Sequence, residues 1–303
     1  KRSVISMHKT KLVSILLFLL LAMPLAHAEE VSCGLTNLAT CIPQKFFEFV
    51  LWIINAPLQP FLSLTKSLMS EPVNVEIFIS LWAIIIYILS IFYGLFIVFA
   101  GFNFIVSGYS AEKREMAKEW LKNIVLMMVF VQGSYYFYSI ILELSSSMTA
   151  GIINSIDPNF FLLTVDNVTN IGLQLTLAMP YLLTLLVTVI FLALRYLLVS
   201  VGVLFFPIGL FFNFIPPIKS VGKLILNTLF IVIFMPFFHS LMLLAASKLI
   251  DVPSFQNYKI VIMIAAFSLV NLSMIFLAFY AMAKAAMGVI HSDMGKTAAL
   301  LAK

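Results

Sequence analysis

Few side chains in this sequence have the type and spacing that chemistry requires. The four histidines are His8, His27, His239 and His291, and their spacing assembles no metal cluster. His239 lies in an apolar segment, where we expect a helix-packing hydrogen-bond donor rather than a ligand. No serine or cysteine stands beside a plausible base, and no glycine-rich phosphate motif occurs. The sequence therefore predicts neither an enzymatic centre nor a cofactor.

The two cysteines and one asparagine are candidates for covalent modification. Cys33 and Cys41 have seven residues between them. In an extracytoplasmic segment this pair is a candidate disulfide that closes a small loop, and two unpaired thiols are the alternative. Asn167-Val168-Thr169 is a glycosylation sequon with Asn167 as acceptor, in a loop that we expect outside the membrane.

The composition indicates which elements must position these residues. Of 303 residues 62% are hydrophobic and 10% are charged, far from the roughly 25% charge of soluble domains. This excludes a soluble globular enzyme, and 29 phenylalanines exclude a disordered chain. The apolar runs are continuous, whereas a membrane barrel shows short alternating segments. We therefore expect an all-α, polytopic helical membrane protein.

The N-terminal 28 residues resemble a secretory signal. Basic residues precede the apolar run Leu12–Met23, and Ala26-His27-Ala28 fits a signal-peptidase site. We expect cleavage after Ala28, with an uncleaved signal anchor as the alternative. Residues 29–75 are then an extracytoplasmic segment, and residues 76–303 form the helical membrane domain. Without the signal the net charge falls from +5 to +1, so the basic excess is weak evidence for nucleic-acid binding.

The first two apolar segments differ in length. Residues 46–70 read as an amphipathic helix interrupted by Pro57 and Pro60, which we expect at the outer interface; a kinked span is the alternative. Residues 77–106 are 30 residues without a charge, long enough to cross with tilt. Glycines recur there every seven residues and favour close helix approach, within the chain rather than between copies: Gly94, Gly101 and Gly108.

A charged helix follows at residues 111–122. We expect it at the cytoplasmic membrane surface, with i,i+3 ion pairs Glu115/Lys118 and Glu119/Lys122 on its polar side. It is either a docking handle for a cytosolic partner or a solvated topological anchor. The candidate contact residues are Lys113, Arg114, Lys118, Trp120 and Lys122. Further spans are expected at residues 124–148, 171–194, 224–247 and 260–283.

Residues 196–218 carry no charge and have two interpretations. They cross the membrane, or they form a re-entrant hairpin that folds at residues 203–207 and returns before Lys219. The hairpin places 10 basic residues inside and 4 outside, against 7 and 7 for a crossing. The positive-inside rule favours the hairpin, with Lys219 and Lys223 in the cytoplasm. Irregular backbone in a membrane lines a cavity, so the pore candidates are Arg195, Pro207, Gly209, Pro216 and Pro217.

These residues resemble a known family. Arg195, Pro207-Ile208-Gly209, Pro216-Pro217, Lys223 and Pro236, with the basic turn Glu112-Lys113-Arg114, look like the TrbL family and its archaeal DNA-transfer relatives. Its members are polytopic inner-membrane components of type IV secretion and conjugation systems.

The resemblance implies a channel or scaffold subunit in the inner (cytoplasmic) membrane. The signal and the count of basic residues predict the mature N-terminus outside and the C-terminus inside. It implies other secretion-system subunits and a separate ATPase as partners, and single-stranded DNA or protein as the substrate in transit. A homo-oligomer is a further candidate assembly. The alternatives are a small-solute transporter and a structural membrane anchor for a partner complex.

Overall fold

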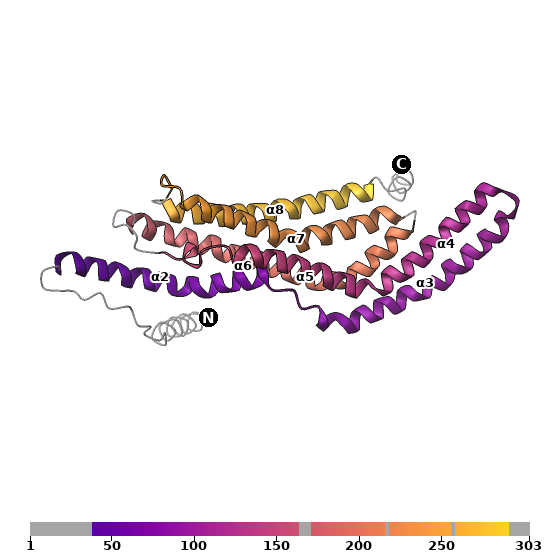
Figure 1. The fold of residues 1–303 in the computed structure, drawn as a ribbon, viewed down its shortest axis with the longest axis horizontal. Coiled ribbons are helices and arrows are strands. Elements are labelled where there is room, and N and C mark those ends of the chain that lie inside the picture. The colour runs from indigo at the N-terminus through magenta and orange to yellow at the C-terminus, as the bar shows by residue number, and fades with distance from the viewer. Residues whose placement is uncertain (1–37, 164–170, 216–217, 256–257, 291–303) are drawn as a thin grey trace, which may run out of the picture. The chain divides into compact units, whose positions relative to one another are not determined.

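The computed structural model describes residues 38–163, 171–215, 218–255 and 258–290, which form helices joined by short connections (Figure 1). The predicted signal, Cys33, Asn167, Pro216 and Pro217 lie outside these residues. The chain divides into two units, residues 1–46 and 47–303, and the hydrophobic core lies in the second. The α-helices are α2 (Leu38–Ser70), α3 (Ile79–Val106), α4 (Ala111–Gln132), α5 (Ser134–Ile153), α6 (Ile171–Phe214), α7 (Lys219–Ile250) and α8 (Lys259–Ile290).

Six helices in the described residues are long and apolar enough to cross a membrane. They cover Lys45–Ser70, Glu76–Val106, Ser134–Ile153, Leu175–Phe214, Lys219–Ile250 and Lys259–Ala281. The described residues contain no strand. The expectation of an all-α, polytopic helical membrane protein is therefore confirmed.

The prediction of a re-entrant hairpin that folds at residues 203–207 is wrong. Helix α6 runs without a break from Ile171 to Phe214, with Pro180 and Pro207 inside it. Pro207 removes one backbone hydrogen bond, and the nearby side chains of Val203 and Phe206 are buried in a cluster with residues of α5 and α7. At about 1.5 Å per residue, the 44 residues of α6 extend about 66 Å. The chain turns only after Phe214, before α7 begins at Lys219.

Two other boundaries differ from the sequence expectation. Helix α2 is not interrupted at Pro57 or Pro60, and it is long enough to cross a membrane. The charged segment 111–122 is not a separate helix, because α4 continues through it to Gln132. The expected span 124–148 instead divides at Gly133, where α4 ends and α5 begins. Backbone hydrogen bonds from Gly133 to Val129 and from Phe137 to Gly133 bridge the division.

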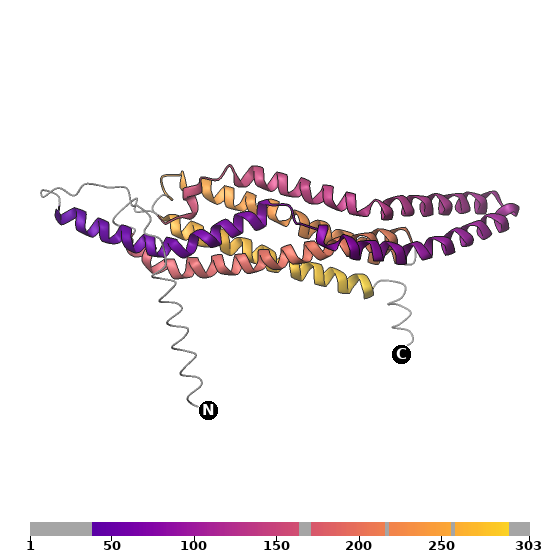
Figure 2. The ribbon, with the colours of Figure 1, turned by 90° about the horizontal axis from the view of Figure 1, so that it is seen from below.

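Three clusters of buried side chains make up the core. One joins α2, the 156–163 connection, α6, α7 and α8; a second joins α5 to the middle of α6 and α7. The third joins α3 and α4 to the C-terminal end of α6 around Phe211. Helices α3 and α4 lie antiparallel, connected through residues 107–110 (Figures 1 and 2).

Helices α6, α7 and α8 alternate in direction (Figure 1), which sorts the lysines at their ends. Lys219 and Lys223 begin α7, at the same end of the bundle as Lys284 near the end of α8. Lys248 and Lys259 lie at the opposite end. Because α6 is one continuous helix, Lys219 and Lys284 lie at the same end of the bundle. The hairpin interpretation also placed these two lysines on one side of the membrane.

Candidate functional site

The site is centred on a buried cation beside an interrupted helix. Arg195 of α6 is only 6% exposed and is the one Lys, Arg, Asp or Glu that is buried among the described residues. Pro236 lies inside α7 and has no N–H, so the carbonyl of Val232, four residues earlier, lacks its helical donor. Arg195 Nε donates to that carbonyl at 3.0 Å, and Nη2 donates to Ile233 O at 2.9 Å. The guanidinium thus closes the gap that the proline opens.

Helix α5 completes the polar cluster from the other side. Ser145 Oγ donates to the same Ile233 carbonyl at 2.8 Å, and Tyr138 Oη donates to Val199 O at 2.6 Å. Both side chains are buried. They lie seven residues apart, hence on one face of α5, together with Leu142. The hydroxyls therefore fasten α5 to the backbones of both α6 and α7.

Glycines allow these helices to approach closely. A Cβ at Gly202 of α6 would lie 2.7 Å from Leu229 Cδ2 and would also meet Tyr138 Oη. A Cβ at Gly222 of α7 would lie 2.7 Å from the carbonyl oxygen of Gly209. Gly209, expected in a pore hairpin, is therefore a packing residue of the α6–α7 pair.

The glycines that the sequence predicts to pack against another helix lie on α3 or directly after it, where they have no such contact within the described part of the chain. A Cβ at Gly94, Gly101 or Gly108 would meet nothing within 4 Å, and all three residues are exposed. The preferred interpretation, packing inside the chain, is therefore wrong. A contact with another molecule stays a prediction for this face of α3.

A second set of polar contacts joins α7 and α8. His239 Nε2 lies 2.8 Å from Ser273 Oγ, and Ser273 donates its own proton to Val270 O at 2.7 Å. With the Ser273 proton directed to Val270 O, the interhelical bond takes its proton from His239 Nε2, the donor role that the sequence predicts for His239. The Nδ1 atom of His239 is buried and has no hydrogen-bond partner. These contacts hold α7 to α8, and they place the Ser273 hydroxyl beside the His239 imidazole, a serine–base pair that the sequence did not predict.

A cavity of about 460 Å³ lies beside the polar cluster, between α6, α7 and α8. Arg195 and Thr228 are its polar lining residues, and the remainder of the lining is aliphatic or aromatic. The hydrogen bonds of Arg195 to Val232 O and Ile233 O use two of its five N–H groups.

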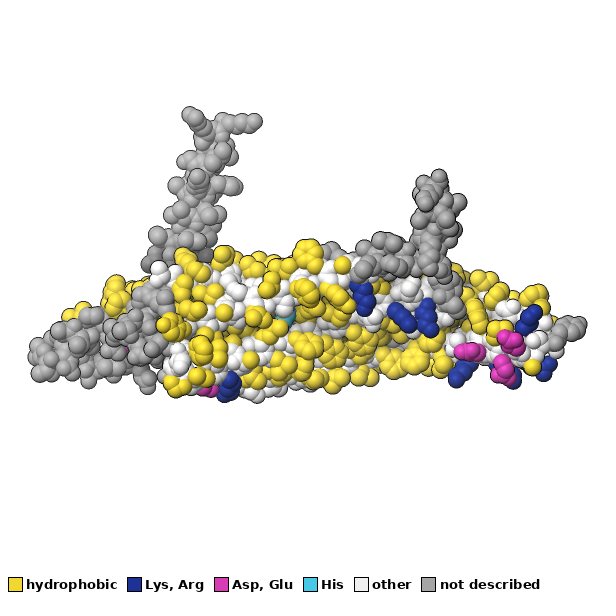
Figure 3. Space-filling model, turned by 90° about the horizontal axis from the view of Figure 1, so that it is seen from above, with side chains coloured by type: hydrophobic (Ala, Val, Ile, Leu, Met, Phe, Trp, Pro, Cys, Tyr) yellow, Lys and Arg dark blue, Asp and Glu magenta, His cyan; other side chains and the backbone are white. Residues whose placement is uncertain are grey.

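The expected cytoplasmic contact residues gather at the end of the bundle that holds Lys219 and Lys223. Trp120 of α4 lies with Phe214 and Ile215 around one small cavity. The ion pair between Lys118 Nζ and Glu115 Oε1 forms at 2.9 Å, on exposed side chains. Figure 3 shows charged side chains gathered towards one end of the face in view, beyond a long apolar surface. The exposed charged residues at this end include Lys113, Arg114, Lys118, Lys122, Lys219 and Lys223.

The fold and these contacts define a multi-pass helical membrane protein. In its core, polar side chains of one helix form hydrogen bonds with backbone carbonyls of a neighbouring helix. Comparison with known proteins gives no match to any family model, any curated protein or any solved structure.

Proposed function

We propose that this chain is a membrane scaffold and channel subunit of a type IV secretion-like machine for DNA or protein transfer. It works in the cytoplasmic membrane beside a separate ATPase, to which it presents the charged end of α4. The proposal rests on the resemblance to the TrbL family at Arg195, Pro207 and Pro236, and on the role of the Arg195 cluster. The observation that carries it is the bonding of Arg195 to the carbonyls beside Pro236.

The bonding pattern favours a structural task for the core. Arginine at membrane depth is expensive, and such residues pair with each other or with backbone carbonyls. Here the guanidinium is committed to α7 rather than to a second charge. A rigid three-helix unit of α5, α6 and α7 is the arrangement that a scaffold needs, because it must keep its surface fixed while partners bind.

The surface supports assembly with other subunits. Helix α3 exposes large side chains along its length, including Tyr87, Leu95, Phe102 and Ile105. Its exposed glycines leave room for another helix to approach, which suits either a second copy or a different subunit. The charged end of α4 suits a cytosolic partner such as an ATPase, and it leaves DNA phosphate as an alternative ligand.

Gene deletion combined with targeted variants tests the proposal. Deletion should abolish DNA or protein transfer without affecting growth, and the wild-type gene should restore it. A triple reversal, Lys113→Glu, Arg114→Glu and Lys118→Glu, should leave the protein in the membrane but abolish transfer. A photo-cross-linker at Lys118 should capture the ATPase in the wild-type background. Intact transfer in the deletion strain would rule the function out.

A second candidate, a small-solute transporter, is favoured by the cavity beside Arg195. A buried guanidinium next to a 460 Å³ space suits a small anionic solute. Uptake of such a solute by proteoliposomes that contain the purified chain alone would favour this candidate over the scaffold.

A further inference from the structure

A second cavity lies away from Arg195, where α2 packs on the rest of the bundle. Its volume is about 420 Å³, inside the range of roughly 300–1,000 Å³ typical of small-molecule sites. Its floor is buried and mostly apolar: Thr65, Met69, Ile153, Ile156, Leu243 and Phe267. Its rim is exposed and polar: Gln59, Ser63, Lys66 and Asn154.

The walls of this cavity are held by specific contacts. Asn55 of α2 makes two hydrogen bonds with the backbone of Leu163: its Nδ2 donates to Leu163 O at 2.8 Å, and its Oδ1 accepts from Leu163 N at 3.2 Å. Tyr181 Oη donates to Phe161 O at 2.8 Å. These bonds fix α2 and the 156–163 connection on either side of the cavity, so the space is part of the fold.

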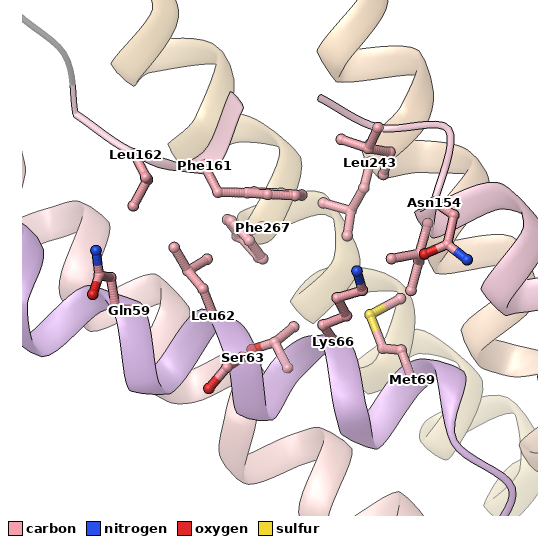
Figure 4. Close-up of a pocket in the computed structure, with 13 residues that line it drawn as sticks. Gln59, Leu62, Ser63, Lys66, Met69, Asn154, Phe161, Leu162, Leu243 and Phe267 are labelled. Carbon is pink, nitrogen blue, oxygen red and sulfur yellow. The ribbon is translucent and has the colours of Figure 1, made fainter. Parts of the chain in front are cut away.

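Lys66 gives the cavity its charge. Figure 4 shows the side chain of Lys66 extending from α2 towards Leu243. No acidic side chain is among the described residues that line the cavity. The described ion pairs join other residues, so the Lys66 ammonium has no carboxylate partner in the described part of the chain.

The rim also lies where two candidate spans end. Lys66 is four residues from the end of the span Lys45–Ser70, and Asn154 directly follows the span Ser134–Ile153. Lysines near span ends carry their ammonium to the level of lipid headgroups. An ammonium at the rim and an apolar floor beneath it match a molecule with an anionic head and a hydrocarbon tail.

We propose that the cavity between α2, α5, α7 and α8 binds one acyl chain of an anionic phospholipid, with the phosphate paired to Lys66. Bilayer phospholipid is the source because the cavity belongs to a chain that spans the membrane. The lipid fills space between α2 and the bundle, and it joins the two through Lys66. A zwitterionic lipid of the same chain length lacks the net negative charge that the unpaired ammonium favours.

Native mass spectrometry of the full-length protein in detergent tests the site. The probes are phosphatidylglycerol and phosphatidylcholine with identical acyl chains. One lysine favours an anionic lipid by about fivefold, so wild type should retain phosphatidylglycerol about fivefold over phosphatidylcholine. Lys66→Gln should lose the preference but still bind both lipids weakly. Leu243→Phe, which adds volume to the floor, should lose binding of both.

The matched control is Lys248→Gln, which removes an exposed lysine near the end of α7 that does not line the cavity. It should keep the wild-type preference, and thermal unfolding should show all variants folded. The proposal is overturned if Lys66→Gln retains the fivefold preference or if folded Leu243→Phe binds as wild type does. Palmitate is the third probe: binding of palmitate without phosphatidylglycerol would contradict a phospholipid occupant.

Discussion

Arg195 supplies the hydrogen bond that Pro236 removes. The proline has no N–H for Val232 O, and Arg195 Nε donates to this oxygen from the neighbouring helix at 3.0 Å. In a membrane interior without water, a free carbonyl costs several kcal/mol or finds another donor. The same contact also offsets the cost of burying the guanidinium charge, because the dipoles of two carbonyls stabilise that charge. Arg195 therefore satisfies the carbonyl that Pro236 leaves free, and this carbonyl helps to stabilise the buried charge of Arg195.

This relationship predicts non-additive stabilities. Arg195→Leu leaves Val232 O without a donor, while Ile233 O keeps the Ser145 hydroxyl, and it should lower the free energy of unfolding by about 2–4 kcal/mol. Pro236→Ala restores an N–H for Val232 O, so Arg195→Leu should cost at least about 1 kcal/mol less in that background. Equilibrium unfolding in mixed detergent micelles measures both values.

The matched control for this cycle is Arg114→Leu, since Arg114 is an exposed arginine of α4. Its stability should stay within about 0.5 kcal/mol of wild type. Arg195→Lys should be intermediate, because an ammonium on a flexible stem does not reproduce two fixed N–H directions. Equal effects of Arg195→Leu with and without Pro236 would show that the two residues act independently.

The glycines predict opposite outcomes on two helices. Gly222→Ala places a methyl group against the carbonyl of Gly209 and should destabilise the protein by about 1–3 kcal/mol. Gly101→Ala meets no atom and should be neutral or stabilising by up to about 1 kcal/mol. The same unfolding assay compares them. A large loss of stability for Gly101→Ala in the purified, monomeric protein would contradict the open face of α3.

The sequence predicted the class of fold because long uncharged runs have few alternatives in a 62% apolar chain. It also singled out Arg195, as a pore candidate, and His239, as a helix-packing hydrogen-bond donor. It did not predict that α6 continues past Pro207. A proline breaks one hydrogen bond but does not prescribe a turn, and packing against α7 decides between a kink and a hairpin.

The packing glycines were missed for a related reason. Gly94, Gly101 and Gly108 share a seven-residue spacing with Gly202 and Gly209, so the spacing alone does not reveal which set faces a helix of the same chain. The signal that distinguishes them lies in the partner helix. Gly222 follows the turn after α6 and brings the α7 backbone against Gly209. Likewise the Tyr138 and Ser145 face of α5 becomes informative only once Val199 and Ile233 are placed opposite it.

The hydrogen bond between His239 of α7 and Ser273 of α8 predicts that a second substitution restores stability lost by the first. Ser273→Ala removes the acceptor of His239 Nε2–H and should destabilise the protein by about 1 kcal/mol. His239→Leu in that background removes both the orphaned donor and the unsatisfied Nδ1. The double variant should therefore be more stable than Ser273→Ala alone, because replacing both partners by apolar groups is nearly neutral. A double variant less stable than either single variant would contradict this pairing.

The ends of α7 predict a sided response to chemical labelling. Ser220 lies at the start of α7 beside Lys219 and Lys223, and Ser254 follows its other end beyond Lys248. The positive-inside rule predicts that the first group lies in the cytoplasm. With Cys33 and Cys41 replaced by alanine, a membrane-impermeant maleimide should label Ser254→Cys in intact cells. It should label Ser220→Cys only after permeabilisation. Labelling of Ser220→Cys from outside would show that the protein has the opposite orientation in the membrane. The charged end of α4 would then lie outside the cytoplasm, where a cytosolic ATPase does not reach it.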